Sequence, residues 1–224
     1  MIDLDPQASL TISMGFREPD KLDGTITDIF MKVVNDEVIP EGYAIHSVAE
    51  RLDLIPSSID LSAAEVSLVN AMSRELVLRS YMERISSNYD YILIDCMPSL
   101  GVMTINALAA ADRVLIPVQA AYLPVKGLQQ LIRTVNVVKK RLNKNLVIEG
   151  ILINMVDYRT NYAKDITEML HENYGDTVGI LDMYIPFSVK VAEASAGGMS
   201  IYRYAPKCKA AESFEALTKE VLKK

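Results

Sequence analysis

Cysteine and histidine are scarce in this sequence, which limits the kinds of site it can build. The 224 residues include two cysteines, Cys96 and Cys208, and two histidines, His46 and His171. Two cysteines form neither a disulfide framework nor a cysteine-ligated metal cluster, and the histidines lack the spacing of metal ligands. Long apolar runs are missing too, since none approaches the ~18 residues that cross a bilayer. There is no charged-then-apolar leader, so we expect a soluble, cytoplasmic protein.

Positive charge is in the minority. The chain has 23 Lys and Arg against 29 Asp and Glu, a net charge of −6. Because nucleic-acid-binding proteins are often basic, contact with DNA would need a local patch. Solvated helix C-termini, where cations meet the negative end of the helix dipole, are the competing interpretation of the basic clusters. These clusters are residues 139–141 with Lys144, and Lys207, Lys209, Lys219, Lys223 and Lys224.

Four short apolar segments predict a parallel sheet. They do not alternate polar with apolar residues, a pattern typical of strands that are covered on both faces. The segments are 91–95, 113–118, 146–154 and 178–186.

Amphipathic helices are predicted between and after these strands. Pro124 suits the first turn of a helix. The apolar stripe of this predicted helix comprises Leu128, Leu131, Ile132, Val135 and Val138. A second helix is expected over 160–173, with Gly175 as its stop and with Ile166, Met169 and Leu170 inward. A closing helix over 210–222 would bury Phe214, Leu217 and Val221.

The first third of the chain has a weaker pattern. It indicates a short helix over 26–31, short strands at 44–47 and 52–55, and a longer helix over 63–85. With the later alternation of strand and helix, this favours an α/β protein with a doubly wound, mostly parallel sheet and helices on both faces. No repeat or linker is visible, so a single domain over 1–224 is predicted.

Carboxylates lie at the ends of two predicted strands. The chain opens on the end of a buried strand, with Asp3 inside it and Asp5 just after it. Asp95 ends the segment 91–95. Ligands of open α/β sheets bind beyond the carboxyl ends of the strands. A carboxylate there suits Mg²⁺, which keeps much of its water and needs few protein ligands. The alternative is a strand-end Asp that caps the following turn.

The residues around Asp95 belong to a series of motifs. DCMPSLG at 95–101 leads into TINAL at 104–108, AAD at 110–112 and IPVQ at 116–119. With LDPQ at 4–7, DYRTN at 157–161, IP at 185–186, VKVAEA at 189–194 and YAPK at 204–207, the chain closely resembles the ParA family of chromosome and plasmid partition ATPases. This family is a deviant branch of the P-loop NTPases. The resemblance runs from residue 1 nearly to the end.

The resemblance implies a role for several acidic and loop residues. Asp5 matches the residue that positions the attacking water, with Asp3 near the metal. Asp95 matches the Walker B carboxylate, and the loop from Pro98 to Gly101 matches the switch that senses the γ-phosphate. Met97 is a departure, since the family usually has proline there.

Further matches imply contacts with adenine and DNA. Asn154 and Pro186 fall where the family frames the adenine base. Arg159 and Lys190 match positions that contact DNA nonspecifically in some members, across the ATP-bound dimer. Lys190 is commonly arginine; lysine keeps the charge but loses the planar fork, which phosphate contacts tolerate.

The resemblance also implies cofactors and partners. It implies ATP and Mg²⁺ as cofactors, an ATP-dependent homodimer, nonspecific DNA and a ParB-type partition protein that stimulates hydrolysis. The expected location is the cytoplasm, in association with the nucleoid. A membrane partner is not expected.

The phosphate-gripping loop of the family is not found in the sequence. No G-x-x-x-x-G-K-[ST] pattern occurs, and the glycine pair Gly197-Gly198 is not followed by lysine and threonine. The absent part corresponds to one strand–loop–helix unit of roughly 30 residues. Its strand is central, so we expect a gap between neighbouring strands and an unpaired edge. Truncation and degeneration are alternative explanations, and the retained site residues favour truncation. Without the loop we predict no useful ATP hydrolysis.

Other classes of protein share parts of this sequence pattern. A phosphoacceptor receiver domain would explain Asp95 beside a Met-Pro pair, but its Met-Pro lies one residue further on, and its strand-end lysine is missing at 116–118. A MinD-type membrane-cycling ATPase would carry an amphipathic C-terminal helix, although packing on the sheet explains the same stripe. Iron–sulfur reductase relatives are disfavoured by the two cysteines. A non-catalytic partner that dimerises with an intact copy stays open.

Overall fold

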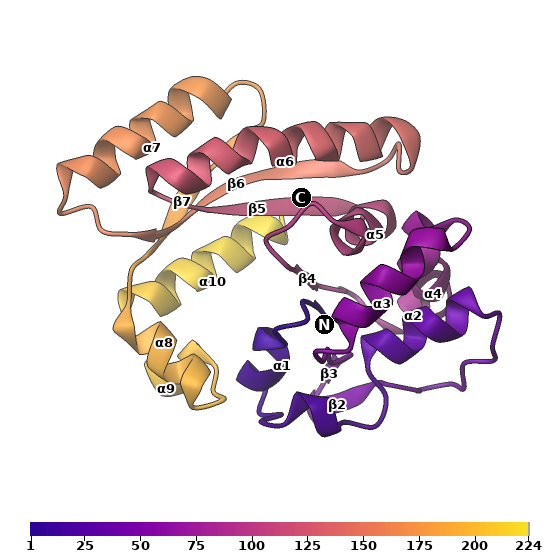
Figure 1. The fold of residues 1–224 in the computed structure, drawn as a ribbon. Helices are drawn as coiled ribbons and strands as arrows, with labels where there is room; N and C mark the ends of the chain where they lie inside the picture. The colour runs from indigo at the N-terminus through magenta and orange to yellow at the C-terminus, as the bar shows by residue number, and fades with distance from the viewer. Residues whose placement is uncertain (224) are drawn as a thin grey trace. The chain divides into compact units, whose positions relative to one another are not determined.

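The computed structural model describes residues 1–223, without the side chains of residues 122–126. Pro124 and Lys224, named above, therefore lie outside the described side chains and residues respectively. The chain forms two compact units: Met1–Ala111 with Val138–Lys144, and Asp112–Val137 with Asn145–Lys224 (Figure 1). We call them unit 1 and unit 2. The single-domain assignment stays a prediction.

Unit 1 is built on two short parallel strands. Strand β1 (Ile2–Leu4) pairs with β4 (Ile94–Cys96), so that Asp3 lies opposite Asp95. On its other side β1 forms a parallel bridge to Ile55. Strands β2 (His46–Ala49) and β3 (Leu52–Leu54) form an antiparallel pair just before it.

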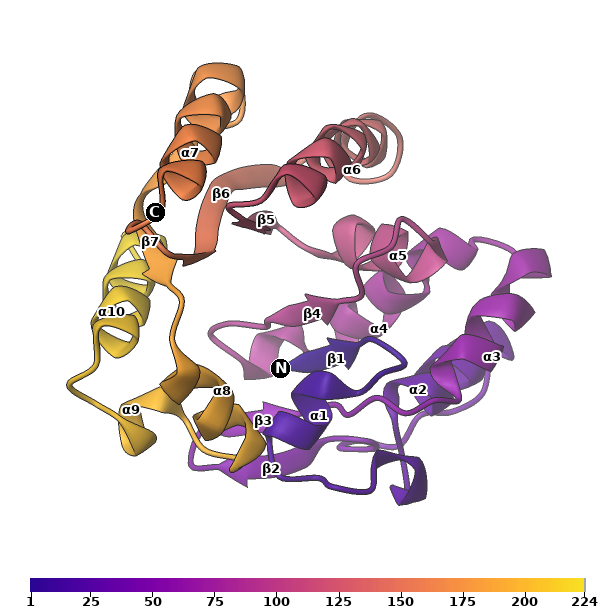
Figure 2. The same ribbon diagram turned by 60° about the vertical axis from the view of Figure 1, so that its left-hand side comes forward.

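Helices bury the apolar side chains of β1. They are α2 (Ile26–Val34), α3 (Leu61–Ser67), α4 (Val77–Ile85) and α5 (Val102–Ala110), with the short α1 (Ser9–Ser13) (Figure 2). Single 3₁₀ turns occur at η1 (Pro19–Lys21), η2 (Leu68–Asn70), η3 (Arg74–Leu76) and η4 (Ser86–Asn88). Helix α2 starts at a capping box, in which the Thr25 N–H donates to Asp28 at 2.8 Å. The core of unit 1 includes Ile2, Leu4, Ile26, Ile29, Phe30, Leu61, Leu78 and Met103.

Unit 2 is a three-stranded parallel sheet with helices on both faces. The strand order is β5 (Arg113–Gln119), β6 (Val147–Val156) and β7 (Ile180–Pro186). Successive residues of β6 point into different cores. Ile151 and Ile153 pack with α6 (Tyr122–Arg141) and α7 (Asn161–Tyr174). Leu152 packs with α10 (Lys209–Val221). The shorter α8 (Val189–Ala196) and α9 (Ile201–Tyr204) precede α10.

Most predicted elements of unit 2 are confirmed. Helix α7 begins after Thr160, whose hydroxyl accepts from the Ala163 N–H at 3.2 Å. It ends before Gly175, which keeps a right-handed conformation with φ −53°. The predicted inward residues are buried or half-buried: Leu128, Leu131, Ile132, Val135 and Val138 of α6, Ile166, Met169 and Leu170 of α7, and Phe214, Leu217 and Val221 of α10.

The predicted long helix over 63–85 is wrong. Helix α3 ends at Ser67, and Ser73 has the left-handed φ of 52° before α4 starts at Val77. A non-glycine residue with this φ interrupts a right-handed helix. The apolar period continues across the break because both helices face one core, Leu68 before it and Leu78 after it.

Two strands predicted to be covered on both faces are not. Strand β4 is limited to Ile94–Cys96, and before it Tyr91 and Leu93 are 65% and 66% exposed. In β5, Ile116 and Val118 are buried while alternate residues are exposed. Among the described residues of the four predicted strands, β6 has the longest continuous buried run, because helices cover both of its faces.

The strands β4 and β5 lie at sheet edges. Among the described residues, β4 pairs only with β1 and β5 pairs only with β6. Within the described residues, no helix is long and apolar enough to span a bilayer.

Candidate functional site

Asp3 is a buried carboxylate that organises the loop after β1. Its side chain is fully buried within strand β1. Oδ2 accepts hydrogen bonds from the N–H and the hydroxyl of Thr11, at 2.8 and 2.7 Å. Oδ1 accepts from the N–H of Asp5 at 3.1 Å. A buried charge requires such partners, so Asp3 serves loop geometry, and its predicted place near a metal stays a prediction.

Thr11 links this carboxylate to a third segment. Its hydroxyl donates to Asp3 and accepts from the Ser57 N–H at 3.0 Å. The hydroxyl is fully buried in α1, beside the loop that carries Asp5. One side chain therefore connects β1, α1 and the segment after β3.

Asp5 leads the loop and is only half engaged. Its Oδ1 accepts from the Gln7 N–H at 2.9 Å, and its carbonyl accepts from the Ala8 N–H at 2.9 Å. Ala8 then has the left-handed φ of 52°. No hydrogen bond to Oδ2 of Asp5 is formed within the described residues, which leaves one oxygen for a ligand.

Asp95 is exposed on β4 and stands opposite Asp3 in the parallel register. Its carboxylate makes no hydrogen bond or ion pair within the described part of the chain. Partial desolvation, and then the negative charges of Asp3 and Asp5, raise the pKa of the Asp95 carboxyl. The register and these charges place the three acids near the carboxyl ends of β1 and β4, and the roles predicted for Asp5 and Asp95 stay a prediction.

These acids fit a magnesium ion that has other ligands as well. Within the described residues, no group of three or more His, Cys, Asp or Glu side chains is arranged to hold a metal by itself. Mg²⁺, however, is commonly held by one or two carboxylates together with water and substrate phosphates. Asp95 with both oxygens open, and Asp5 with one, provide this kind of donor set.

The loop after β4 is ordered by its own hydrogen bonds. The Ser99 N–H donates to the Met97 carbonyl at 2.8 Å, and the Thr104 hydroxyl donates to the Ser99 carbonyl at 2.7 Å. Pro98 is exposed, and Gly101 is the N-cap of α5. A Cβ at Gly101 would clash with the Glu65 carboxylate unless that side chain moved. The loop is thus adjacent in sequence to Asp95 and tied to α5.

Asn154 and Pro186 lie on neighbouring strands of unit 2. Asn154 is half-buried near the end of β6, and its Oδ1 accepts from the Met155 N–H at 2.9 Å. The strand register shifts there, and Met155 has φ 54°. Pro186 ends β7 opposite Val156. The bulge takes Asn154 out of the β6–β7 ladder, although Asn154 stays paired with Gln119 of β5.

An open hollow lies beyond these strand ends. Tyr158 and Tyr184 meet in it edge to face, with ring centroids 4.4 Å apart. Its lining comprises Val156, Asp157, Tyr158, Arg159, Tyr184, Pro186, Phe187 and Lys209. The structure therefore brings Pro186 and Arg159 to one hollow, whose lining does not include Asn154 or Lys190.

Arg159 is 88% exposed but paired. Its Nε donates to Oδ1 of Asp157 at 2.7 Å and its Nη2 to Oδ2 at 2.6 Å. Side-chain hydrogen bonds from Arg159 lower the pKa of Asp157 to about 2, and the same bonds raise the pKa of Arg159. The pair is therefore ionised at neutral pH.

Two lysines lie at helix N-termini, where the helix dipole disfavours a positive charge. Lys190 is in the first turn of α8, and Lys209 is the first residue of α10; both are exposed. The helix dipole is positive at the N-terminus and disfavours cations there. The helix-end interpretation thus suits residues 139–141 and Lys219, which lie in last turns, but not Lys209.

Sequence reasoning missed Asp157 and Lys209 as members of the hollow. The Asp-x-Arg spacing at 157–159 was a usable signal, because an Asp side chain readily bonds backbone two residues on. Lys209 had no such signal, since it comes to the hollow through the packing of α10 on β7.

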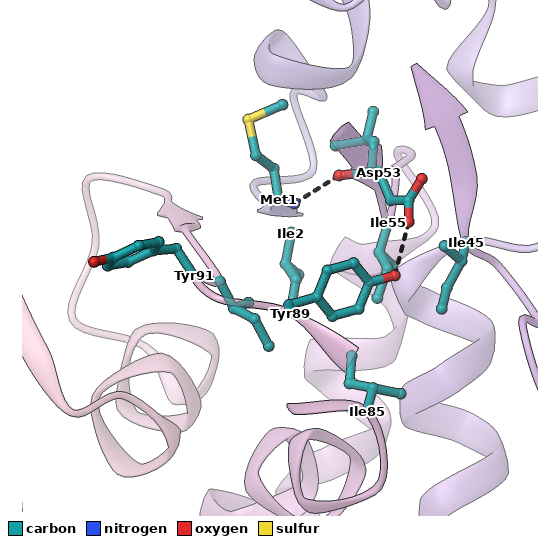
Figure 3. A pocket seen from close by; sticks show the side chains of 10 residues that line it. Met1, Ile2, Ile45, Asp53, Ile55, Ile85, Tyr89 and Tyr91 are labelled. Atoms are coloured by element: carbon teal, nitrogen blue, oxygen red, sulfur yellow. Dashed lines mark hydrogen bonds between the residues drawn. The ribbon is translucent and has the colours of Figure 1, made fainter. Parts of the chain in front are cut away.

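A second hollow lies in unit 1, at the amino end of β1 (Figure 3). Its lining is mostly apolar, with Ile2, Ile45, Ile55 and Ile85. The Tyr89 hydroxyl donates to Asp53 at 2.9 Å, and burial together with this bond raises the pKa of Tyr89 to about 12. Asp5 follows the other end of the strand, so this hollow is separate from the acids.

Comparisons with known proteins give a consistent result. A family model described as an AAA domain matches residues 1–148. The chain is 41% identical to the sporulation initiation inhibitor protein Soj of Bacillus subtilis, over 99% of this chain and 85% of that protein. It is 40% identical to the chromosome partitioning protein ParA of Myxococcus xanthus, over 100% of this chain and 77% of that one.

Among solved structures, the chain resembles a cobyrinic acid a,c-diamide synthase from Mycobacterium smegmatis that has a bound ATP analogue and magnesium. The TM-score is 0.83 at 31% identity, over 99% of this chain and 80% of that one. The similarity supports the α/β nucleotide-binding fold.

Proposed function

The chain belongs to the ParA family of partition ATPases, and from this premise we propose that it acts in the segregation of plasmid or chromosome DNA. In this proposal a magnesium–nucleotide site at the β1–β4 edge controls dimerisation, and unit 2 binds DNA without sequence preference. The observation that supports the proposal is the parallel register of Asp3 with Asp95. Because of it, Asp5 and Asp95 lie near the carboxyl ends of two neighbouring strands.

The acids have different roles in this site. Asp95 would hold Mg²⁺, and the ion would neutralise charge on the phosphates. Asp5, with one oxygen open, would orient the attacking water. Asp3 and Thr11 hold the loop that positions Asp5. Pro98 to Gly101 would respond to the γ-phosphate, because this loop joins Asp95 to α5.

Unit 2 supplies the features proposed for the base and for DNA. Asn154 at the bulge and Pro186 at the strand end would frame adenine. Arg159, Lys190 and Lys209 are exposed cations. The two lysines lie at helix N-termini, where the dipole disfavours a cation, so a bound phosphate would offset this electrostatic cost. Contacts of this kind give affinity without reading sequence.

Activity and partners are the finer part of the proposal. ATP and a ParB-type partition protein would act on an ATP-dependent homodimer that is cytoplasmic and associated with the nucleoid. Residues 1–224 contain no glycine–lysine phosphate loop. We therefore propose that the chain alone hydrolyses no ATP at a useful rate, and a non-catalytic dimerising role is the alternative. Magnesium-dependent turnover that Asp5→Ala abolishes would contradict this.

The magnesium site can be tested through stability. Partial burial, and then the charges of Asp3 and Asp5, disfavour the ionised Asp95 carboxylate in the folded state and so raise its pKa. Its contribution to stability is therefore greatest below its unfolded pKa and falls as pH rises through the folded pKa. We expect Asp95→Asn to raise the free energy of unfolding at pH 7 and to have little effect near pH 3. Added Mg²⁺ should stabilise the wild-type chain and not Asp95→Asn.

Urea denaturation without Mg²⁺ and with Mg²⁺ at about 10 mM measures both effects. Asp23→Asn is the matched control, since Asp23 is an exposed carboxylate in the same unit without an ion pair in the described residues. It should keep the magnesium response of the wild type. An equal response to Mg²⁺ in the wild type and in Asp95→Asn would sink the proposed site.

A further inference from the structure

The exposed arginine proposed to contact DNA is held by a carboxylate two residues before it. Asp157 accepts from Nε and Nη2 of Arg159 at 2.7 and 2.6 Å. Its Oδ1 also accepts from the Arg159 backbone N–H at 3.2 Å. All three bonds lie within one loop, between β6 and α7.

This arrangement occupies the side of the guanidinium that a phosphate would use. Arginine binds carboxylate and phosphate with the same planar fork of two parallel N–H groups. A phosphate can therefore form a two-bond contact with this side of Arg159 only by displacing Asp157. The pair also has no net charge, which reduces the counterion release that drives nonspecific DNA binding.

We infer that Asp157 is a built-in competitor of DNA phosphate for Arg159, and that it sets the strength of nonspecific DNA binding. The inference rests on the DNA-binding function proposed above. An intramolecular carboxylate at this spacing keeps the contact weak and quickly reversible. Reversibility suits a protein that must bind and leave DNA repeatedly during partition.

Asp157→Asn is a sharp variant for this test. The asparagine Oδ1 still accepts from the Arg159 N–H, so the loop keeps its turn. The variant loses the charge and the charge-assisted fork. The double variant Asp157→Asn/Arg159→Ala separates the release of Arg159 from a general gain of positive charge.

Asp176→Asn controls for net charge. Asp176 is exposed and follows the other end of α7, roughly 20 Å of helix away from Arg159. It removes one negative charge without touching the ion pair.

The experiment measures binding of the full 224-residue chain to a random-sequence duplex by fluorescence anisotropy. The salt concentration is varied from about 20 mM to about 200 mM. We expect Asp157→Asn to bind roughly two- to five-fold more tightly, the factor that corresponds to an exposed ion pair. Arg159→Ala should bind more weakly, with a salt slope smaller by about one. The double variant should match Arg159→Ala, and Asp176→Asn should match the wild type.

The two proposals fail in different ways. If Arg159→Ala weakens binding but Asp157→Asn leaves it unchanged, the DNA contact holds and the competitor role is overturned. The role is equally overturned if the tightening persists in the double variant. If Arg159→Ala has no effect, or no variant binds the duplex at the lowest salt, the proposed DNA contact fails and the inference with it.

Discussion

At the scale of single residues, the three acids of unit 1 differ in how much of each carboxylate is engaged. Both oxygens of Asp3 accept hydrogen bonds, Asp5 uses one oxygen for a turn, and Asp95 uses none within the described residues. This gradient follows burial, since Asp3 is inside the strand and Asp95 is exposed. It separates the acid that builds the loop from the acids that can meet a ligand.

Thr11 is the residue whose removal tests this division. We expect Thr11→Val to lower the free energy of unfolding by about 1–3 kcal/mol, because it removes one of the two hydrogen bonds to Oδ2 of the buried Asp3 and leaves the Ser57 N–H without its hydroxyl partner. Valine has nearly the same shape, so little packing is lost. Urea denaturation at pH 7 measures the change.

Thr11→Ser is the control for this prediction. Serine keeps the hydroxyl and loses only a methyl group, so its effect should be clearly smaller than that of Thr11→Val. A loss of stability from serine as large as that from valine would assign the role of Thr11 to packing rather than to Asp3.

At the scale of elements, the break between α3 and α4 is the clearest departure from the sequence pattern. Ser73 is exposed and has φ 52°, a conformation that costs a non-glycine residue energy. We therefore expect Ser73→Gly to leave stability unchanged or to raise it by up to about 1 kcal/mol. Thermal and urea unfolding both report the difference.

Ser80→Gly provides the opposite sign. Ser80 is exposed in the middle of α4, where its hydroxyl donates to the Leu76 carbonyl at 3.1 Å. Glycine in a helix interior costs roughly 0.5–1 kcal/mol. If both substitutions destabilised the chain equally, Ser73 would lie in a continuous helix and the observed break would be wrong.

The predictability of the elements follows the source of each pattern. Helices α6, α7 and α10 each bury one stripe against one sheet, so the period of 3.6 located them well. Two helices facing one core produce the same period as one long helix, which is why the pattern over 63–85 predicts a single helix. The exposure of β4 and β5 depends on their place at sheet edges, and local sequence does not encode that place.

The positions of Asp5 and Asp95 were predictable from local sequence. Both residues follow apolar segments, and the parallel pairing of β1 with β4 puts the carboxyl ends of these strands side by side. The hollow of unit 2 was only partly predictable, because Tyr158 and Tyr184 meet across two strands. The engagement of Asp3 by Thr11 needed a side-chain geometry that no spacing rule supplies.

At the scale of the whole molecule, the net charge of −6 works against binding any polyanion. DNA and an anionic bilayer would both have to meet a local cluster of cations. These two partners differ in what else they need, since bilayer binding requires an apolar helix face that is free to insert. The C-terminal helix α10 decides between them.

The apolar face of α10 is already used in unit 2. Phe214 and Leu217 pack against Leu181 and Ile185 of β7. Among the large apolar residues that the structure describes over 209–223, only Leu222, after the helix, is strongly exposed. We expect the chain to stay in the supernatant when it is centrifuged with phosphatidylglycerol vesicles. Phe214→Ala should lower the free energy of unfolding by about 1–3 kcal/mol, less than for a fully buried aromatic residue because Phe214 is half-buried. Leu222→Ala should be nearly neutral. A MinD-like mode would give the reverse pattern, with vesicle binding that Leu222→Ala reduces and a Phe214→Ala chain as stable as the wild type.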